Sequence, residues 1–515
     1  MKLVNSAEMR AIDRETIDHQ GISGPELMEN AGRGIADFIL NLLIEKPKET
    51  SCAVVCGKGN NGGDGFVVAR RLSKAGVQVS VYFIGPVDKL SPDARLNHDR
   101  LKECKIKPTP VTTVDDLPDD IESDFIIDAI LGTGFSGVPE GLAAELIEYI
   151  NEQAFRVISI DLPSGLNADT GRHDGAIVFA DHTFTLALPK FGLYVSPGRE
   201  AAGMVAVVPI GIPDVAIEKF DLHTELIMSW DIAELLPERK PDGHKGDFGK
   251  LLLVAGSTGL AGAAALASRS AIRSGCGLVK LACPATTQPV LAVKLTEATT
   301  IPLPDVGKKG ALALRSLGEI KKLMAEHDAL VVGPGLGLHH ETLELVRRLV
   351  ISLDKPAILD ADGITAFTGK AELIKNRQHD AGLVLTPHPG EFARLTGKTV
   401  PADIHERIAL AIQTARELNI VLVLKGSPTL VASSDGRCWL NPTGNSGMAT
   451  GGSGDVLSGM IGSFLAQGLS ALNAALCGVF IHGTAGDIAA DLFTQRAMIA
   501  GDIVECLPKA FESVG

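Results

Sequence analysis

The sequence has no block of basic residues. Its 48 Lys and Arg are outnumbered by 62 Asp and Glu, which gives a formal net charge of −14 at pH 7. Proteins that bind nucleic acid normally present a basic patch or stripe, so we do not expect a nucleic-acid partner. If this acidic protein binds an anion, backbone amides and helix N-termini must supply the local positive potential.

Paired cysteine spacings are missing as well. The eight cysteines are scattered along the chain, without the CxxC pairs that are typical of zinc and redox sites. Cys52 and Cys56 bracket a strand-like run, and strand alternation would place both on one face. The pattern predicts buried, reduced thiols rather than disulfides or zinc ligands.

The sequence also lacks a Walker A loop, an internal repeat and an apolar signal core at its N-terminus. Without a signal core, a cytoplasmic protein is expected. Residues 456–486 contain no Asp, Glu, Lys or Arg, but glycines and polar residues interrupt them, and residues 468–470 have the composition of a helix stop and restart. We therefore predict two buried helices here, and no membrane partner.

What is present is the pattern of an α/β protein. A chain of 515 residues is too long for one ordinary core, and its composition is that of a soluble globular protein. A capping box from Asn5 to Glu8 predicts a helix that begins near Ser6, and Pro25 fits the first turn of a second helix. Strands are then expected at 52–56, 77–84, 124–131 and 157–160, alternating with helices at 66–75, 94–103 and 142–151. This alternation predicts a mainly parallel sheet with helices on both faces.

Polar, glycine-rich loops follow three of these strands, at residues 57–65, 128–138 and 161–167. Ligands bind beyond the carboxyl ends of parallel strands. The first loop has the G-x-G-x-x-G spacing, but no acidic residue ends the next strand, which disfavours an ordinary NAD dehydrogenase. Edge strands at 182–188 and 204–208 are expected to close this domain. The polar side chains expected at one shared site are Asn61, Asp64, Asp128, Asp161 and Ser164.

A second series of strands is expected at 250–255, 330–332, 357–359, 383–385 and 421–424. Near the C-terminus, the glycine loop of residues 441–455 leads into an apolar run from Val456 that predicts a buried helix. Glycines allow backbone N–H groups to crowd together and the helix dipole favours negative charge, so this loop is expected to bind phosphates. Asp455 would then accept a proton from a hydroxyl; the alternative is a flexible surface loop with a capping Asp.

The motifs of the second half resemble those of the NAD(P)H-hydrate dehydratase family, in the ribokinase-like superfamily. In order, they are HKG at 244–246, GS at 256–257, GPGLG at 333–337, DADG at 360–363, TPHPGE at 386–391 and the glycine loop before Asp455. The first half resembles the NAD(P)H-hydrate epimerase family, so the whole chain is similar to the fused, bifunctional NAD(P)H-hydrate repair enzymes of bacteria. The resemblance implies an N-terminal Rossmann-like three-layer domain over residues 1–220 and a C-terminal ribokinase-like α/β domain over residues 226–515.

For the first domain, the resemblance implies that Asp161 is the catalytic acid/base and that Asn61, Asp128 and Ser164 hold a potassium ion. Hard oxygen ligands suit an alkali cation, which agrees with that assignment. The alternative for Asp128 and Asp161 is that each caps the turn after its strand. Lys190 would either reach a substrate phosphate or stay solvated. The implied substrate-binding residues are Asn60, Asn61, Gly62, Gly63, Asp64, Gly132, Thr133, Gly134, Phe135, Ser136, Gly137, Val138 and Asp161.

For the second domain, the resemblance implies catalysis by Asp455 with a magnesium ion and with ADP or ATP as co-substrate. A strand-end histidine such as His388 is more often structural, and the small residues near Gly262 would either admit a flat ring or serve helix packing. The implied substrate-binding residues are Gly262, Ala263, Gly337, His388 and Asp455. The implied ADP-binding residues are Lys425, Gly426, Ser427, Pro428, Thr429, Asn445, Ser446, Gly447, Met448, Ala449, Thr450, Gly451, Gly452, Ser453 and Gly454.

The reactions implied by the resemblance repair hydrated NADH and NADPH (NADHX and NADPHX). The first domain would interconvert the R and S hydrates. The second would dehydrate the S hydrate after transient phosphorylation of its hydroxyl, because phosphate leaves more readily than hydroxide. The resemblance also implies a homo-oligomer. The alternatives are a ribokinase-like small-molecule kinase with an N-terminal nucleotide-binding module, and a first domain that is a non-enzymatic interaction module.

Overall fold

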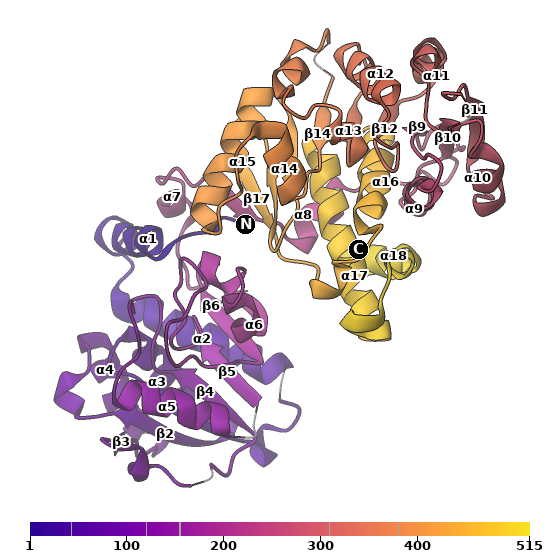
Figure 1. Cartoon of the computed structure of the whole chain (residues 1–515). Helices are drawn as coiled ribbons and strands as arrows, with labels where there is room; N and C mark the ends of the chain where they lie inside the picture. Colours follow the sequence, from indigo (N-terminus) through magenta and orange to yellow (C-terminus); the bar gives the residue numbers. More distant parts are fainter. Residues whose placement is uncertain (43, 120, 154–155, 308, 380) are drawn as a thin grey trace. The chain divides into compact units, whose positions relative to one another are not determined.

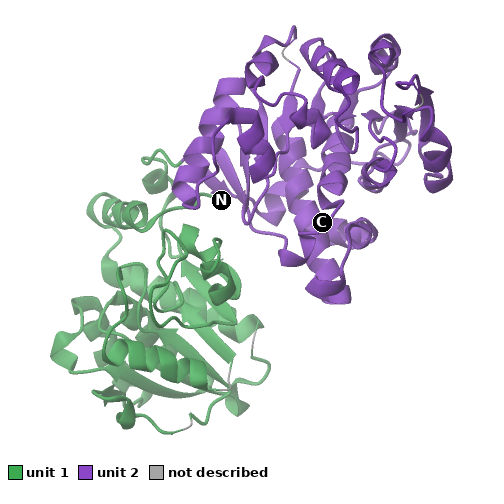
Figure 2. Cartoon of the chain, viewed as in Figure 1, with its two compact units in different colours: residues 1–222 green, residues 223–515 purple. Residues whose placement is uncertain are grey.

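The computed structural model describes residues 1–42, 44–119, 121–153, 156–307, 309–379 and 381–515. The chain forms two compact units, Met1–Leu222 and His223–Gly515 (Figure 2). In both units helices and strands alternate along the chain (Figure 1). The predicted α/β class with two domains is confirmed.

The first unit is built around a parallel sheet. Over its described residues, seven strands pair in the order β3-β2-β1-β4-β5-β6-β7. The chain direction across the sheet reverses between β1 and β4, and open α/β sheets bind ligands at such switch points. The strands are β1 Ser51–Cys56, β2 Gln78–Ile84, β3 Thr109–Val111, β4 Phe125–Ala129, β5 Arg156–Ile160, β6 His182–Leu186 and β7 Met204–Val208. The helices are α1 Ser6–His19, α2 Gly24–Leu42, α3 Asn60–Ala75, α4 Pro92–Arg100, α5 Leu142–Glu152, α6 Gly198–Ala202 and α7 Asp214–Ile217.

Alternate residues of β1 supply the two core layers of this unit. Cys52, Val54 and Cys56 pack in one apolar cluster with α2 and α3, whereas Ala53 and Val55 pack in another with α5. Both faces of the strand are therefore buried, as a parallel sheet covered by helices requires. The prediction that the two cysteines are buried on one face is confirmed.

Two predictions for this unit were wrong. The strand at 182–188 is not an edge strand, because β6 pairs with β5 on one side and β7 on the other. The loop predicted at 57–65 is a loop only as far as Gly59, since α3 begins at Asn60. A Cβ on Gly62 would lie 2.1 Å from the carbonyl oxygen of Gly57, so the missing side chain lets the helix start directly against the strand end.

The second unit contains a larger mixed sheet. Its described residues form ten strands in the order β11-β10-β9-β12-β13-β14-β15-β16-β17-β8, parallel except where β16 pairs with β15 and β17. The pattern analysis missed the antiparallel pair β16 and β17. The strands are β8 Thr224–Leu226, β9 Lys250–Val254, β10 Leu278–Pro284, β11 Thr299–Leu303, β12 Ala329–Val332, β13 Ala357–Leu359, β14 Leu383–Leu385, β15 Val421–Leu424, β16 Thr429–Ala432 and β17 Cys438–Asn441. The helices are α8 Ser229–Leu235, α9 Ala261–Arg273, α10 Gln288–Lys294, α11 Leu317–Ala325, α12 His340–Ile351, α13 Asp362–Thr365, α14 Pro389–Thr396, α15 Ile404–Leu418, α16 Ser453–Ala466, α17 Ala471–Ala497 and α18 Ala500–Val514.

The uncharged stretch near the C-terminus forms two buried helices, as predicted. α16 is buried along almost its whole length, and Gly468 in the left-handed region separates it from α17, which Ser470 caps. In the described part of the chain, α17 is the one helix whose length and composition would allow it to cross a bilayer. In the protein, 61% of its most apolar window is buried among other residues.

Candidate active sites

A cavity of about 770 Å³ lies at the carboxyl ends of the first unit's strands. Eight of the residues predicted to bind substrate line it: Asn60, Asn61, Asp64, Gly132, Thr133, Gly134, Phe135 and Asp161. The other five, Gly62, Gly63, Ser136, Gly137 and Val138, are not among its walls. Gly62 and Gly63 instead allow α3 to pack against Gly57 and Met28.

Asp161 sits at the end of β5 in a buried polar network. Its φ of 65° is unusual for a non-glycine residue, and strained backbone of this kind is frequent at functional sites. Its Oδ2 accepts a hydrogen bond from the Thr133 amide at 3.3 Å, and its Oδ1 accepts one from Lys190 Nζ at 2.6 Å. Burial raises the pKa of the Asp161 carboxyl, but the Lys190 charge and hydrogen bonds outweigh it and leave the pKa below its ordinary value. Asp161 is therefore ionised at neutral pH.

The interpretation of Lys190 as a solvated side chain was wrong, because the side chain is buried; its contact with a substrate phosphate stays a prediction, since Lys190 lines the cavity. Its side chain is only 1% exposed. Its ammonium group has three N–H bonds, and Nζ has three acceptors within reach: Asp161 Oδ1 at 2.6 Å, Leu186 O at 2.7 Å and Thr185 Oγ1 at 3.1 Å. Lys190 therefore orients the Asp161 carboxyl and keeps it ionised.

Asp128 and Ser164 form a second cluster beside the cavity. Ser164 donates to Asp128 from its Oγ at 2.5 Å and from its amide at 2.8 Å. Asn61 Nδ2 donates to Leu131 O at 3.0 Å, and the Leu131 amide donates to Ser164 Oγ at 2.8 Å. The structure therefore links the three residues predicted to hold potassium. Asn61 Oδ1 is buried without a hydrogen-bond partner among the described residues.

The walls from α1 and α2 were missed by the sequence analysis. Met9, Asp13 and Ile17 line the cavity from α1, and Leu27 and Met28 from α2. Met9, Asp13 and Ile17 are spaced four residues apart, which places them on one face of α1. This spacing does not show what the face covers. Burial, and then the charge of Asp161, raise the pKa of the Asp13 carboxyl to about 6 against the opposing effect of Lys190.

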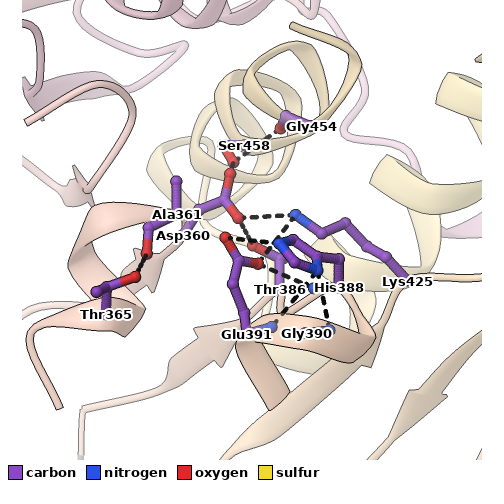
Figure 3. Close-up of polar contacts among 10 residues, drawn as sticks. All are labelled: Asp360, Ala361, Thr365, Thr386, His388, Gly390, Glu391, Lys425, Gly454 and Ser458. Atoms are coloured by element: carbon purple, nitrogen blue, oxygen red, sulfur yellow. Dashed lines mark hydrogen bonds and ion pairs between the residues drawn. The ribbon is translucent and has the colours of Figure 1, made fainter. Parts of the chain in front are cut away.

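In the second unit, four elements meet at Asp360 (Figure 3). Its Oδ1 accepts hydrogen bonds from Thr386 Oγ1 at 2.8 Å and from Lys425 Nζ at 3.0 Å. Its Oδ2 accepts one from Ser458 Oγ at 2.6 Å. Asp360, Thr386 and Lys425 follow β13, β14 and β15, and Ser458 belongs to α16, so this carboxylate joins three strand ends to the helix that carries Asp455.

The glycine loop delivers Asp455 into the first turn of α16. Gly452 caps the helix with a φ of 98°, which a residue with a side chain would rarely adopt. A Cβ on Gly454 would lie 3.2 Å from Lys425 Nζ, so the ammonium group lies over this turn. Burial, and then the charge of Asp360, raise the pKa of Asp455 to about 7. The Lys425 ammonium group, the first turn of α16 and a carboxyl whose pKa is near neutrality therefore lie together.

The other four residues predicted to bind substrate in this unit have different surroundings. Gly262 has open space above it, which favours a ligand over helix packing there, whereas Ala263 packs against Gly335. The Gly337 amide donates to Asp362 Oδ2 at 2.7 Å. His388 is half exposed, and its Nδ1 accepts hydrogen bonds from the Gly390 and Glu391 amides at the start of α14.

The predicted nucleotide loop is held on α17 by residues that the sequence analysis did not single out. Asp487 accepts hydrogen bonds from the Gly444 amide at 2.8 Å and from Asn445 Nδ2 at 2.9 Å. Ser446 Oγ donates to Gln495 Oε1 at 2.8 Å. On the other side of the site, Thr429 Oγ1 donates to Gly426 O at 3.0 Å and closes the turn between β15 and β16.

Comparison with known proteins connects both sites to one family. Residues 251–509 match the family described as NAD(P)H-hydrate dehydratase, and residues 24–192 match the YjeF-related protein N-terminus. The bifunctional NAD(P)H-hydrate repair enzyme Nnr of Moorella thermoacetica is 42% identical over 513 residues, which cover 99% of this chain and 96% of the relative. The enzyme of the same name from Escherichia coli is 32% identical, over 98% of this chain and 92% of the relative.

A solved structure matches the second unit. The ADP/ATP-dependent NAD(P)H-hydrate dehydratase of Bacillus subtilis, co-crystallised with ATP and Mg²⁺, is 33% identical and superposes with a TM-score of 0.49. The match covers 56% of this chain and 99% of that one. The full-length relatives establish the family by themselves, and they disfavour both a simple kinase and a non-enzymatic first domain. The chain belongs to the family of bifunctional NAD(P)H-hydrate repair enzymes, which join an epimerase to a nucleotide-dependent dehydratase.

Proposed function

We propose that the cavity of the first unit epimerises hydrated NAD(P)H and that the Asp360–Asp455 site of the second unit dehydrates the S hydrate. In the second unit, the α16 amides and Lys425 hold the nucleotide phosphates. Asp455 takes the proton of the substrate hydroxyl while that oxygen receives a phosphoryl group. Phosphate then leaves with the electron pair of the C–O bond, assisted by the neighbouring ring nitrogen. The adjacent ring carbon loses a proton, the ring double bond forms and NAD(P)H is restored. The observation that carries the proposal is the position of Asp455 in a helix turn that lies under the partly buried ammonium group of Lys425.

A magnesium ion fits the donor set of this site. Glu391 places a carboxylate oxygen 3.8 Å from Lys425 Nζ and contributes to the raised pKa of Asp455, so a hard oxygen ligand is present beside the phosphate site. Glu391 would hold the ion together with the nucleotide phosphates. When bound, magnesium supplies neutralisation of the charge on the transferring phosphoryl group.

The proposed function is tested by incubating the protein with separated NADHX epimers and with ADP or ATP. The near-ultraviolet absorbance of NADH should return from the S epimer only when nucleotide is present, and from the R epimer only after epimerisation. Parallel reactions with ADP and with ATP identify the phosphoryl donor. A stable phosphorylated product without NADH would instead identify a small-molecule kinase.

Epimerisation should depend on potassium. Asn61 Oδ1 is a buried carbonyl oxygen without a partner among the described residues, and it lies in one hydrogen-bonded cluster with Ser164 and Asp128. These residues would hold a potassium ion with hard oxygen atoms only. Replacing potassium with tetramethylammonium should lower the epimerisation rate at least several-fold and leave dehydration of the S hydrate unchanged. Equal epimerisation rates in both salts would contradict the assignment.

Lys190→Met should move the activity of the first unit to higher pH. Lys190 keeps the pKa of Asp161 low, so its removal raises that pKa and makes the base ionise only at higher pH. Epimerisation should be lost near neutrality and partly recovered in alkaline buffer, with an unfolding free energy lower by roughly 3–5 kcal/mol because a buried charge loses its partner. Rate profiles from pH 5 to 10, with thermal melts of the full chain, check this. An equal loss of rate at every pH would indicate a purely structural role.

A further inference from the structure

We propose that Asp13 is a second proton-transferring residue of the epimerase site. It would act from α1, whereas Asp161 acts from the carboxyl end of β5. The proposal rests on the placement of epimerisation in the cavity of the first unit. Asp13 is not part of the glycine-rich loops that the sequence analysis assigned to the substrate.

The structure holds Asp13 firmly against the cavity. It lines the cavity from the middle of α1, together with Met9 one turn before it. The helix is fastened at its start by Ser6, whose amide and Oγ donate to Asp169 at 2.6 and 2.8 Å. Further along, Arg10 Nη1 donates to the carbonyl oxygen of Thr133 at 3.4 Å and ties the helix to the loop after β4. Asp13 and Asp161 therefore reach one cavity from two separate elements.

The Asp13 carboxyl is also less constrained by hydrogen bonds than the Asp161 carboxyl. Asp161 Oδ1 accepts a hydrogen bond from Lys190, whereas the Asp13 carboxyl is affected by burial and by the charges of Lys190 and Asp161, with no hydrogen bond to a described residue. The other charged residues that line the cavity are Arg10, Lys58, Asp64, Asp93, Glu140, Asp161 and Lys190. Burial raises the pKa of Asp13 to about 6, close enough to neutrality for the carboxyl both to give and to take a proton.

The neighbouring carboxyl of Asp64 is less suited to this work. Burial raises its pKa well above the ordinary value, and the charges of Asp161 and Asp13 raise it further. This shift favours the protonated form of Asp64, which can serve the substrate as a hydrogen-bond donor. Asp13 is therefore better suited than Asp64 to exchange a proton in each turnover, alongside Asp161.

Inversion of the hydrated ring carbon calls for two such groups, because the hydroxyl leaves one face and returns on the other. In one direction, one carboxyl protonates the hydroxyl; the C–O bond breaks with its electron pair on oxygen, and water departs. The ring nitrogen stabilises the cation that remains. A water molecule then bonds to the carbon from the opposite face, and the other carboxylate takes its proton. The reverse direction exchanges the two roles, and solvent resets the protons.

The test compares Asp13→Asn, Asp13→Glu, Asp161→Asn and the control Asp18→Asn, in which an exposed carboxyl on the same helix is changed. Epimerisation of each NADHX epimer is followed by chiral chromatography in the absence of nucleotide, so that the dehydratase stays silent. We expect Asp13→Asn to lower kcat by roughly 10²–10⁴-fold with less than a threefold change in KM. The limb near pH 6 in the wild-type rate profile should disappear, and Asp13→Glu should restore part of the rate. Dehydration of the S epimer should stay at the wild-type rate.

Wild-type epimerisation in Asp13→Asn, with Asp161→Asn inactive, would overturn the proposal and leave the site assignment standing. Wild-type rates in both variants would overturn the site assignment together with it. A lower kcat that keeps the limb near pH 6, or that comes with a parallel rise in KM, would reduce Asp13 to a positioning role and also overturn the proposal.

Discussion

Asp455→Ala is expected to abolish dehydration of the S hydrate while the nucleotide still binds. The carboxyl lies in the first turn of α16, beside the amides and the Lys425 ammonium group that would hold the phosphates. Removing a negative charge there should leave nucleotide affinity unchanged or raise it. Removing the base should lower the rate of NADH recovery by roughly 10²–10⁴-fold or more. Calorimetric titration with ADP or ATP, alongside the absorbance assay, measures both quantities.

Asp502→Ala is a matched control for this variant. Asp502 is also an acidic residue in the first turn of a helix, and its Oδ2 accepts a hydrogen bond from the Ile499 amide at 2.8 Å. Its loss should cost about 0.5–2 kcal/mol of stability without changing the chemical rate. If affinity and rate collapse together in Asp455→Ala, Asp455 is a loop anchor, and Asp360 or Asp362 becomes the next candidate for the base.

The pH dependence of dehydration follows from the same carboxyl. Burial and the charge of Asp360 raise the pKa of Asp455 to about 7. Only the ionised form can accept the hydroxyl proton, so kcat/KM should rise with pH through about 7 and then level off. A rate that is already maximal at pH 5 would show that a different group accepts the proton.

Asp161→Asn is expected to remove epimerisation and to spare the dehydratase. Asn keeps the shape of the side chain and can still accept a hydrogen bond from Lys190, but it cannot take a proton. Conversion of one separated NADHX epimer into the other should slow by roughly 10²–10⁴-fold. Dehydration of the S epimer should continue, because Asp455 belongs to the other compact unit.

Asp181→Asn provides the control for this variant. Asp181 directly precedes β6 of the same sheet, and its Oδ2 accepts a hydrogen bond from the Val157 amide at 2.8 Å, near the amino end of β5. It is not among the residues that line the cavity. Its substitution should affect stability alone. Equilibration of the epimers at the wild-type rate in Asp161→Asn would sink the assignment of Asp161 as acid or base.

Local patterns in the sequence were sufficient for much of the fold. The capping box at Asn5 predicted the start of α1, and the apolar run from Val456 predicted α16. The strands β13, β14 and β15 have the predicted bounds. Each of these features depends on hydrogen bonds or apolar periodicity within a few neighbouring residues, so a linear pattern contains the necessary information.

Sequence alone also located the glycine loops and the carboxyls that follow the strands, including Asp161 and Asp455. The sequence did not show which side chains contact these carboxyls. Lys190 lies 29 residues beyond Asp161, and Ser458 lies 98 residues beyond Asp360. No local pattern relates such pairs, because their contacts depend on which strands become neighbours in the sheet.

Tertiary structure alone decided which of these groups meet. The order of the strands brings β5 beside β6 and thereby buries Lys190 against Asp161. The packing of α1 across the loop after β4 turns Asp13, an unremarked residue of an amphipathic helix, into a wall of the cavity. Burial and neighbouring charges then set the pKa of each carboxyl. The sequence contains the acids and bases, but their protonation at neutral pH is a property of the folded environment.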